Sequence, residues 1–246
     1  MNPDKVLKPS LDKPEHYSLS GTIGWMLVLT IGIGTLIKGL IAGPMVYLGY
    51  EISAVNAFLG KPSIAFLAVL LSLAVAYPLL KIATHHSLEK GLPLDFLAIK
   101  PVSFSPLAKW AVLAITLGAT QSLLLNWLEV PRFEAVHELI RGGNSLGPMI
   151  LFTLNTCLLA PVLIEFVFRG MAYRRIEQSR FGIKGAIVIP TLVFVAVQMQ
   201  YSWHVIVSVL PTALLLGFVR YKTDNLVNCM LIHIMMNVLA LVFTLS

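Results

Sequence analysis

The fold is decided by twenty residues near the end of the chain, Leu226–Leu245, which read LVNCMLIHIMMNVLALVFTL. The stretch contains no Asp, Glu, Lys or Arg, and about 20 apolar residues suffice for a helix to cross a bilayer. His233 and Asn237 lie one helical turn apart within it, and Cys229 falls on the same stripe of the helix. Because polar groups at this depth need partners or water, the stretch predicts both a membrane span and a polar site.

The rest of the chain has a similar composition. Of its 246 residues, 57% are hydrophobic and only 12% are charged, which is about half the charge of a soluble domain. This balance excludes a soluble enzyme, a disordered chain and a coiled coil, and it indicates an all-α polytopic membrane protein. The net charge of +6 is not gathered in one run, so we expect the lipid bilayer and no nucleic acid as a partner. Two cysteines are too few for a disulfide framework or a four-cysteine zinc site.

Seven apolar segments are candidate spans, and the count rises to eight if the first segment holds two. The segments are residues 21–50, 63–83, 106–128, 147–168, 185–201, 203–219 and 226–245. The fifth and sixth are short and nearly continuous, which is typical of a tight helical hairpin. Between the third and fourth, the spacing of apolar residues in 129–146 predicts a short amphipathic helix. We divide the chain into a polar tail (1–18), N-terminal transmembrane helices (19–104) and a core (105–246).

Basic residues are distributed unevenly between the two sides of the expected membrane. If the N-terminus is cytoplasmic, thirteen Lys and Arg residues lie inside, Arg220 among them, and only Lys61, Arg132 and Arg141 lie outside. The positive-inside rule therefore predicts a cytoplasmic N-terminus. The polar residues 1–18 do not form a signal peptide, and the simple topology suggests a prokaryotic inner membrane.

Ionisable residues within spans are costly, so each is a functional candidate. Glu165 and Arg169, at the end of the fourth candidate span, are four residues apart and can pair on one helix face. Two interpretations are open, a structural ion pair or part of a functional site. His233 and Asn237 leave the same choice, because they can bridge two helices or offer hydrogen bonds to a developing oxyanion.

The order and spacing of these residues resemble the CAAX protease and bacteriocin-processing family, also called the CPBP or Abi family. That family is marked by Glu-Glu-x-x-x-Arg, Phe-x-x-x-His and His-x-x-x-Asn/Asp, each on its own helix. Here the three motifs read IEFVFR (164–169), FVAVQ (194–198) and HIMMN (233–237). The resemblance covers about residues 105–246. It implies a core of four C-terminal helices and the activity of an intramembrane endopeptidase.

Two departures from the family pattern concern the activation of water. The resemblance implies a water-activating base at position 164 and a water-positioning His at position 198, and these positions hold Ile164 and Gln198. His233 and Asn237, to which the resemblance assigns oxyanion stabilisation, are retained. Because isoleucine cannot accept a proton and a general base contributes typically 10²–10⁴-fold, we expect a weak or inactive peptidase, that is, a pseudoprotease. We expect its site to bind a membrane peptide or protein partner without metal or cofactor, and to be lined by Glu165, Arg169, Gln198, His233 and Asn237.

Three other interpretations are open. The protein could be an active endopeptidase with Glu165 as the base and with His233 and Asn237 as the oxyanion site. It could be a thiol enzyme in which Cys229 attacks and His233 takes its proton. Spans with buried polar groups also suit a transporter or a membrane scaffold, although the chain has no inverted repeat of the kind many transporters have.

Overall fold

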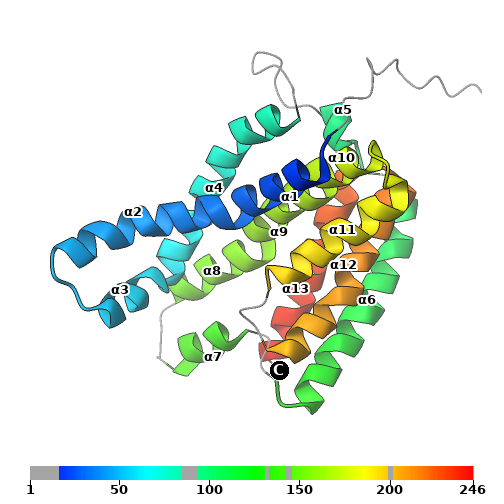
Figure 1. Ribbon diagram of the computed structural model, residues 1–246. Coiled ribbons are helices and arrows are strands. Elements are labelled where there is room, and N and C mark those ends of the chain that lie inside the picture. The colour runs from blue at the N-terminus through cyan, green and yellow to red at the C-terminus, as the bar shows by residue number, and fades with distance from the viewer. Residues whose placement is uncertain are drawn as a thin grey trace, which may run out of the picture.

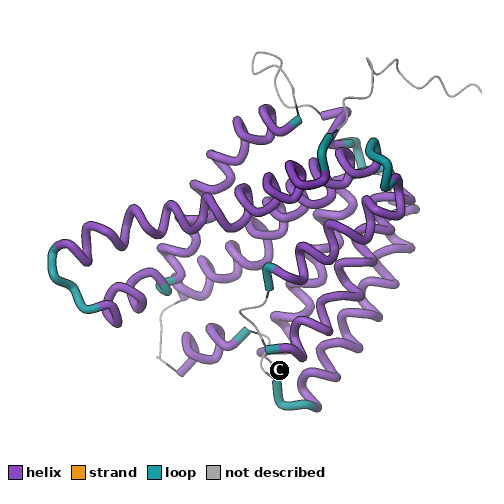
Figure 2. Tube along the Cα trace, in the orientation of Figure 1, coloured by secondary structure: helices purple, strands orange, loops and turns teal. Residues whose placement is uncertain are grey.

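The structure, a computed structural model, describes residues 17–84, 94–102, 104–130, 133–141, 146–198 and 202–245. Among these residues all regular structure is helical and no strand occurs (Figure 2). The all-α prediction is therefore confirmed. Most of the predicted polar tail lies outside the described residues.

The N-terminal part consists of long apolar helices. α1 (Leu19–Leu27), a π-helical turn (Val28–Gly32) and α2 (Ile33–Tyr47) follow one another without a break, and α4 (Pro62–Ala83) packs against α2. α3 (Ile52–Leu59) connects α2 to α4. In Figure 1, α2 and α3 extend beyond the C-terminal helices on one side of the molecule.

The C-terminal part is a bundle that carries the polar residues. Its helices are α6 (Phe104–Trp127), α8 (Leu146–Leu154), α9 (Ala160–Glu165), α10 (Tyr173–Glu177), α11 (Gly182–Ala196), α12 (Trp203–Thr223) and α13 (Leu226–Leu245). The π-helical segments Asn155–Leu159 and Phe166–Ala172 join α8, α9 and α10 into one long helical span. α12 packs between α6, α11 and α13, and α13 also packs against α6 and α9.

In the part of the chain that the structure describes, six helical segments are long and apolar enough to cross a membrane. The fifth of the seven expected spans is shorter than expected, because α11 has 15 residues and ends at Ala196. At 1.5 Å per residue, α11 covers about 22 Å of a hydrocarbon core about 30 Å thick. The amphipathic helix expected within 129–146 is present as α7 (Glu134–Arg141), and a further short helix, α5 (Leu94–Leu97), precedes α6.

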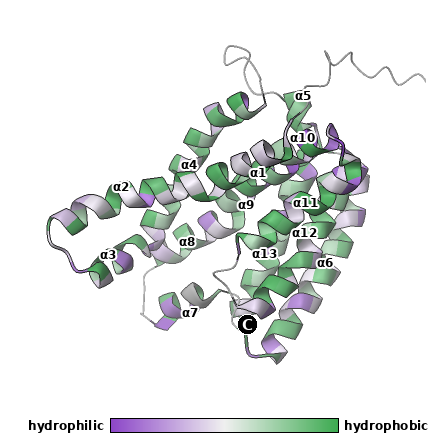
Figure 3. Ribbon diagram, viewed as in Figure 1, coloured by the Kyte–Doolittle hydropathy of each residue, from purple (hydrophilic) through white to green (hydrophobic). Residues whose placement is uncertain are grey.

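The largest buried apolar cluster joins the two parts of the molecule. Met26 and Leu29 of the first span pack together with Phe168 and Met171, which belong to the π-helical segment Phe166–Ala172. Apolar residues also cover the outer faces of most helices (Figure 3), as expected for helices in contact with lipid. The packing therefore places the segment after Glu165 at the centre of the molecule.

The turn from α12 to α13 sets the position of the last helix. Asp224 ends α12 with a positive φ of 42°, a conformation that side chains with short polar groups tolerate best. Asn225 Oδ1 then accepts the backbone N–H of Val227 at 3.0 Å, which caps the start of α13. The N–H of Leu226 donates to the carbonyl of Ala98 at 2.8 Å. This turn brings α13 back along α12 and directs His233 toward α9.

Candidate functional site

Glu165 is the centre of a buried polar cluster. It is the last residue of α9 and has an exposed fraction of 0%. Its Oε1 atom accepts from Arg169 Nη1 at 3.2 Å and contacts Nδ1 of His233 at 2.7 Å. An ionised carboxylate can only accept hydrogen bonds, so the imidazole hydrogen is expected on Nδ1. Three polar side chains that the sequence singled out thus meet in one place.

Arg169 connects this cluster to two further helices. Its Nη2 atom donates to the carbonyl of Ala213 on α12 at 2.8 Å. Its guanidinium lies over the ring of Phe194 on α11, 5.6 Å from the ring centre. The predicted pairing with Glu165 is confirmed, and Arg169 has an exposed fraction of only 2%. The cluster therefore links α9, α11 and α12.

His233 completes the link to α13. Phe194 lies edge-on to the His233 ring at 6.4 Å and edge-on to Phe168 at 5.6 Å. The imidazole is thus held between a carboxylate and an aromatic ring. Phe194, the first residue of the second motif, packs in contact with both partners of Glu165, Arg169 and His233.

The charges in the cluster balance. A buried carboxylate and a buried guanidinium cost several kcal/mol each when unpaired, and pairing with further hydrogen bonds offsets that cost. The ion pair Glu165–Arg169 by itself carries no net charge. One oxygen of the same carboxylate, Glu165 Oε2, is buried and has no hydrogen-bond partner.

Two of the five predicted site residues lie apart from the cluster. Asn237 donates from Nδ2 to the carbonyl of Thr156 at 2.9 Å, and Thr156 belongs to the π-helical segment Asn155–Leu159. Gln198 lies just beyond the end of α11, is half-buried, and makes none of the side-chain hydrogen bonds found among the described residues. Ile164, at the expected base position, packs against the largest apolar cluster.

Cys229 does not support the thiol-enzyme interpretation. Its Sγ atom lies 3.6 Å from the carbonyl of Leu216 and 3.7 Å from that of Asn225. The hydrogen-bond partner of His233 is instead Glu165. Cys229 is fully buried in an apolar cluster, where a cysteine behaves as a small hydrophobic residue.

Arg220 is buried, which the sequence analysis did not predict. The charge count placed it only among the basic residues on the inner side, and the structure shows it in the last turn of α12 with an exposed fraction of 0%. Its Nε donates to the carbonyl of Arg169 at 2.9 Å. The sequence contains one signal of this burial, because Arg220 is followed four residues later by Asp224, a spacing that allows pairing.

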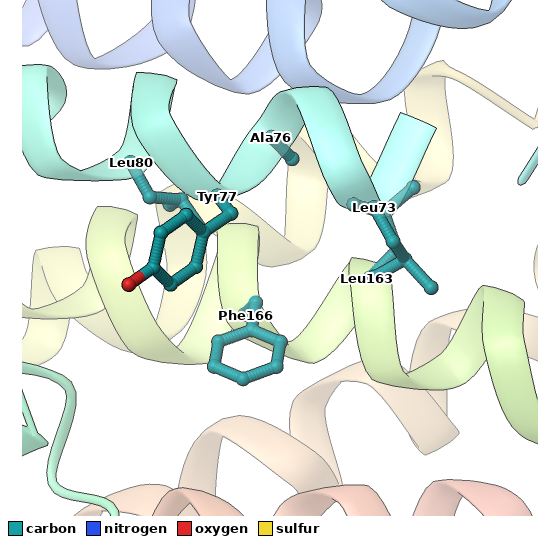
Figure 4. A pocket seen from close by; sticks show the side chains of 6 residues that line it. All are labelled: Leu73, Ala76, Tyr77, Leu80, Leu163 and Phe166. Atoms are coloured by element: carbon teal, nitrogen blue, oxygen red, sulfur yellow. The ribbon is translucent and has the colours of Figure 1, made fainter. Parts of the chain in front are cut away.

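An apolar groove lies beside the polar cluster. It has a volume of about 190 Å³ and is lined by Leu73, Ala76, Tyr77, Leu80, Leu163 and Phe166. Figure 4 shows these side chains coming from α4 on one side and from the α9 region on the other. Leu163 and Phe166 flank Ile164 and Glu165 in the chain. The groove therefore adjoins the helix that carries the first motif.

One comparison with known proteins gives a match. Residues 146–239 match the family model described as type II CAAX prenyl endopeptidase Rce1-like. No curated protein and no solved structure matches the chain. The matched residues contain all three motifs, and the match confirms the resemblance to CAAX-type membrane proteases.

Proposed function

We propose, from the premise that this chain is an Rce1-like family membrane protein, that it binds a membrane peptide or a transmembrane segment of a partner without cleaving it. The observation that carries the proposal is that Glu165 is fully buried and already has two partners within the protein. This carboxylate has no exposed surface and contacts both Arg169 and His233, while the neighbouring base position holds Ile164.

The chemistry of peptide hydrolysis explains why the burial and pairing of Glu165 matter. A general base must lie within about 2.6–3.2 Å of the water whose proton it takes. Glu165 contacts an arginine and a histidine instead, and Ile164 has no group that accepts a proton. Asn237, one of the two residues expected to stabilise an oxyanion, donates to the backbone of Thr156. The polar groups therefore serve contacts within the protein.

The apolar groove supports binding rather than chemistry. Every residue that lines it is apolar or aromatic, and Tyr77 at its rim is 44% exposed. Side chains of a membrane peptide could pack there by van der Waals contact, which drives helix association in lipid. The basic residues on one side of the expected spans favour a cytoplasmic N-terminus, and we propose a prokaryotic inner membrane as the location.

The absence of cleavage is tested by comparing peptide termini in membranes. Cells that lack the protein would be complemented with the wild type or with Glu165→Gln plus His233→Gln, which change little in volume. We expect the same termini in both, with equal amounts of protein in the membrane. Termini that appear only with the wild type would overturn the proposal.

Binding is tested by site-specific photo-crosslinking. A photoreactive residue would replace Tyr77 in the groove or, as a control, Val75, which is equally exposed on α4 (43% against 44%) but does not line the groove. We expect a peptide or protein adduct from position 77 that is weaker or absent from position 75. Equal adducts from both positions, or lipid adducts alone, would contradict binding in the groove.

One observation favours a second function, that of an active endopeptidase. The 2.7 Å contact between Glu165 and His233 joins a carboxylate to an imidazole, and such a pair can hold and pass on a proton. Activity would require the cluster to open so that water reaches Glu165. The comparison of termini separates the two functions, because only an active enzyme leaves termini that depend on Glu165 and His233.

A further inference from the structure

Two hydrogen bonds join Arg169 to α12, and Arg169 is the donor in one and the acceptor in the other. The side chain of Arg169 donates to the carbonyl of Ala213, and the side chain of Arg220 donates to the carbonyl of Arg169. Ala213 and Arg220 are seven residues apart, which is two turns of helix, so they lie on the same face of α12. One face of α12 therefore holds both ends of Arg169, the guanidinium and the backbone carbonyl.

The backbone of Arg169 lies where a hydrogen bond from another helix can fix the position of its carbonyl group. Arg169 lies inside the π-helical segment Phe166–Ala172, where the hydrogen-bond ladder runs from i to i+5 rather than from i to i+4. π-helical turns are rare and occur frequently at functional sites. Arg220 supplies the Arg169 carbonyl with a donor from another helix, which favours one position of this carbonyl.

The guanidinium of Arg220 also contacts a group of charged residues at the end of the bundle. We call this group, Lys100, Arg174 and Asp224, the charged cap. Arg220 Nη1 pairs with Asp224 Oδ1 at 2.6 Å, and the guanidinium lies 4.8 Å from the ring centre of Tyr173. Asp224 also accepts from Lys100 at 2.5 Å and from Arg174 at 3.4 Å. Asp224 is about half exposed, so the cap lies at the surface while Arg220 is fully buried.

We infer that Arg220 is a positioning residue that fixes Arg169, and through it the Glu165–His233 contact, relative to the charged cap at Asp224. The chain of contacts is continuous from Asp224 through Arg220 and Arg169 to Glu165 and His233. The inference holds whether or not the protein cleaves peptides, because it concerns the geometry of the cluster and not its chemistry.

The test reads the hydrogen bond of His233 directly. NMR spectra of the full-length protein in detergent, labelled with ¹⁵N at histidine, report the Nδ1 signal, which His233→Gln assigns by its disappearance. Arg220→Lys keeps the charge that pairs with Asp224 but removes the Nε–H donor. We expect it to move the His233 Nδ1 signal by several linewidths and Asp224→Asn to move it in the same direction by less.

Glu177→Gln is the matched control. Glu177 pairs with Arg174 at 2.7 Å, so this variant disturbs the same charged end of the bundle without contacting Arg220. We expect the His233 signal to stay where it is. A shift as large as that of Asp224→Asn would overturn the inference, because disturbance of the surface charge in general would then explain both.

The Arg220→Lys variant provides a second test that can overturn the inference. An unchanged His233 signal in folded Arg220→Lys protein would overturn the inference. If that variant does not fold, Asp224→Asn decides alone, because Asp224 is half exposed and its amide replacement keeps the shape of the side chain. A shift of the His233 signal in Asp224→Asn then supports the inference, and no shift overturns it.

Discussion

The N-terminal helices and the last two helices are similarly apolar but differ in how they pack. Only 17% of the most apolar part of the Leu19–Tyr47 span is buried inside the protein, against 44% for both Trp203–Thr223 and Leu226–Leu245. The first span presents Leu36, Leu40 and other large side chains outward. The last spans bury His233 and Arg220 instead. Hydropathy therefore identifies a helix that lipid can surround, but it does not tell whether lipid or protein surrounds it.

The largest difference is expected between two carboxylates, Glu165 of α9, which contacts the buried His233 of α13, and Glu51 in the N-terminal region. Glu165→Ala would leave Arg169 buried and unpaired, and breaking a buried pair costs about 3–5 kcal/mol. Glu51→Ala, at the exposed start of α3, removes no such pair and should leave stability nearly unchanged. Unfolding by sodium dodecyl sulfate in mixed micelles measures both free energies. Equal losses in the two variants would refute the structural role of the Glu165 cluster.

Truncation of apolar side chains should separate the regions by a smaller amount. Ile232 on α13 is 1% exposed, whereas Leu40 on α2 is 68% exposed. Ile232→Ala leaves a cavity and should lower the free energy of unfolding by about 2 kcal/mol, the low end for such changes. The low value is expected because lipid tails solvate a leucine or isoleucine as well as protein does. Leu40→Ala should cost much less. The same unfolding assay applies, and a larger loss for Leu40→Ala would mean that α2 packs against a partner.

Two glycines give a third comparison. A Cβ at Gly217 would lie 3.0 Å from Cγ2 of Ile187 on α11, whereas a Cβ at Gly43 would meet nothing within 4 Å. Gly217→Ala should therefore cost about 1 kcal/mol through overpacking, and Gly43→Ala should be neutral or stabilise by up to about 1 kcal/mol. Thermal unfolding followed by circular dichroism measures the two. Stabilisation by Gly217→Ala would contradict the close packing of α11 and α12.

The smallest expected effect concerns the charged cap, and it depends on pH. Burial raises the pKa of Asp224, but hydrogen bonds from Lys100 and Arg220 outweigh it, so the pKa lies below its usual value. A carboxyl whose folded pKa is depressed stabilises the protein above its unfolded pKa of about 3.9, and this stability is lost as the pH falls through the folded pKa. Asp224→Asn should lower the melting temperature by a few degrees at pH 7. The difference from the wild type should shrink below about pH 4, and a constant difference from pH 7 to pH 3 would exclude this cause.

Much of the candidate site followed from local spacing. Glu165 and Arg169 are four residues apart on one helix, and this spacing is enough to predict their pairing. The contact between Glu165 and His233 joins residues 68 positions apart. It depends on the turn at Asp224 and on the packing of α13 against α9, and neither follows from the composition of a span. The sequence analysis therefore left two interpretations of His233 open, a bridge between helices or hydrogen bonds to an oxyanion, and the structure shows its contact with Glu165.

The burial of Arg220 was not predicted from the sequence, for a physical reason. Charge counting treats a basic residue at the end of a span as solvated by water or by lipid headgroups. A long side chain at a helix end can also fold inward when a carbonyl and a carboxylate are within reach, as those of Arg169 and Asp224 are. The choice between the two depends on the neighbouring helices.

The sequence by itself determined that this protein is a helical membrane protein, roughly where its spans lie, and which three motifs it carries. It could do so because hydropathy and helical spacing are local properties, and because the family is marked by residues at short intervals. Only the tertiary structure decided that α11 ends at Ala196, that Glu165 is enclosed between Arg169 and His233, and that Arg220 is buried. These features arise from contacts between helices that are distant in the chain, where packing and the cost of an unpaired charge select one arrangement among many.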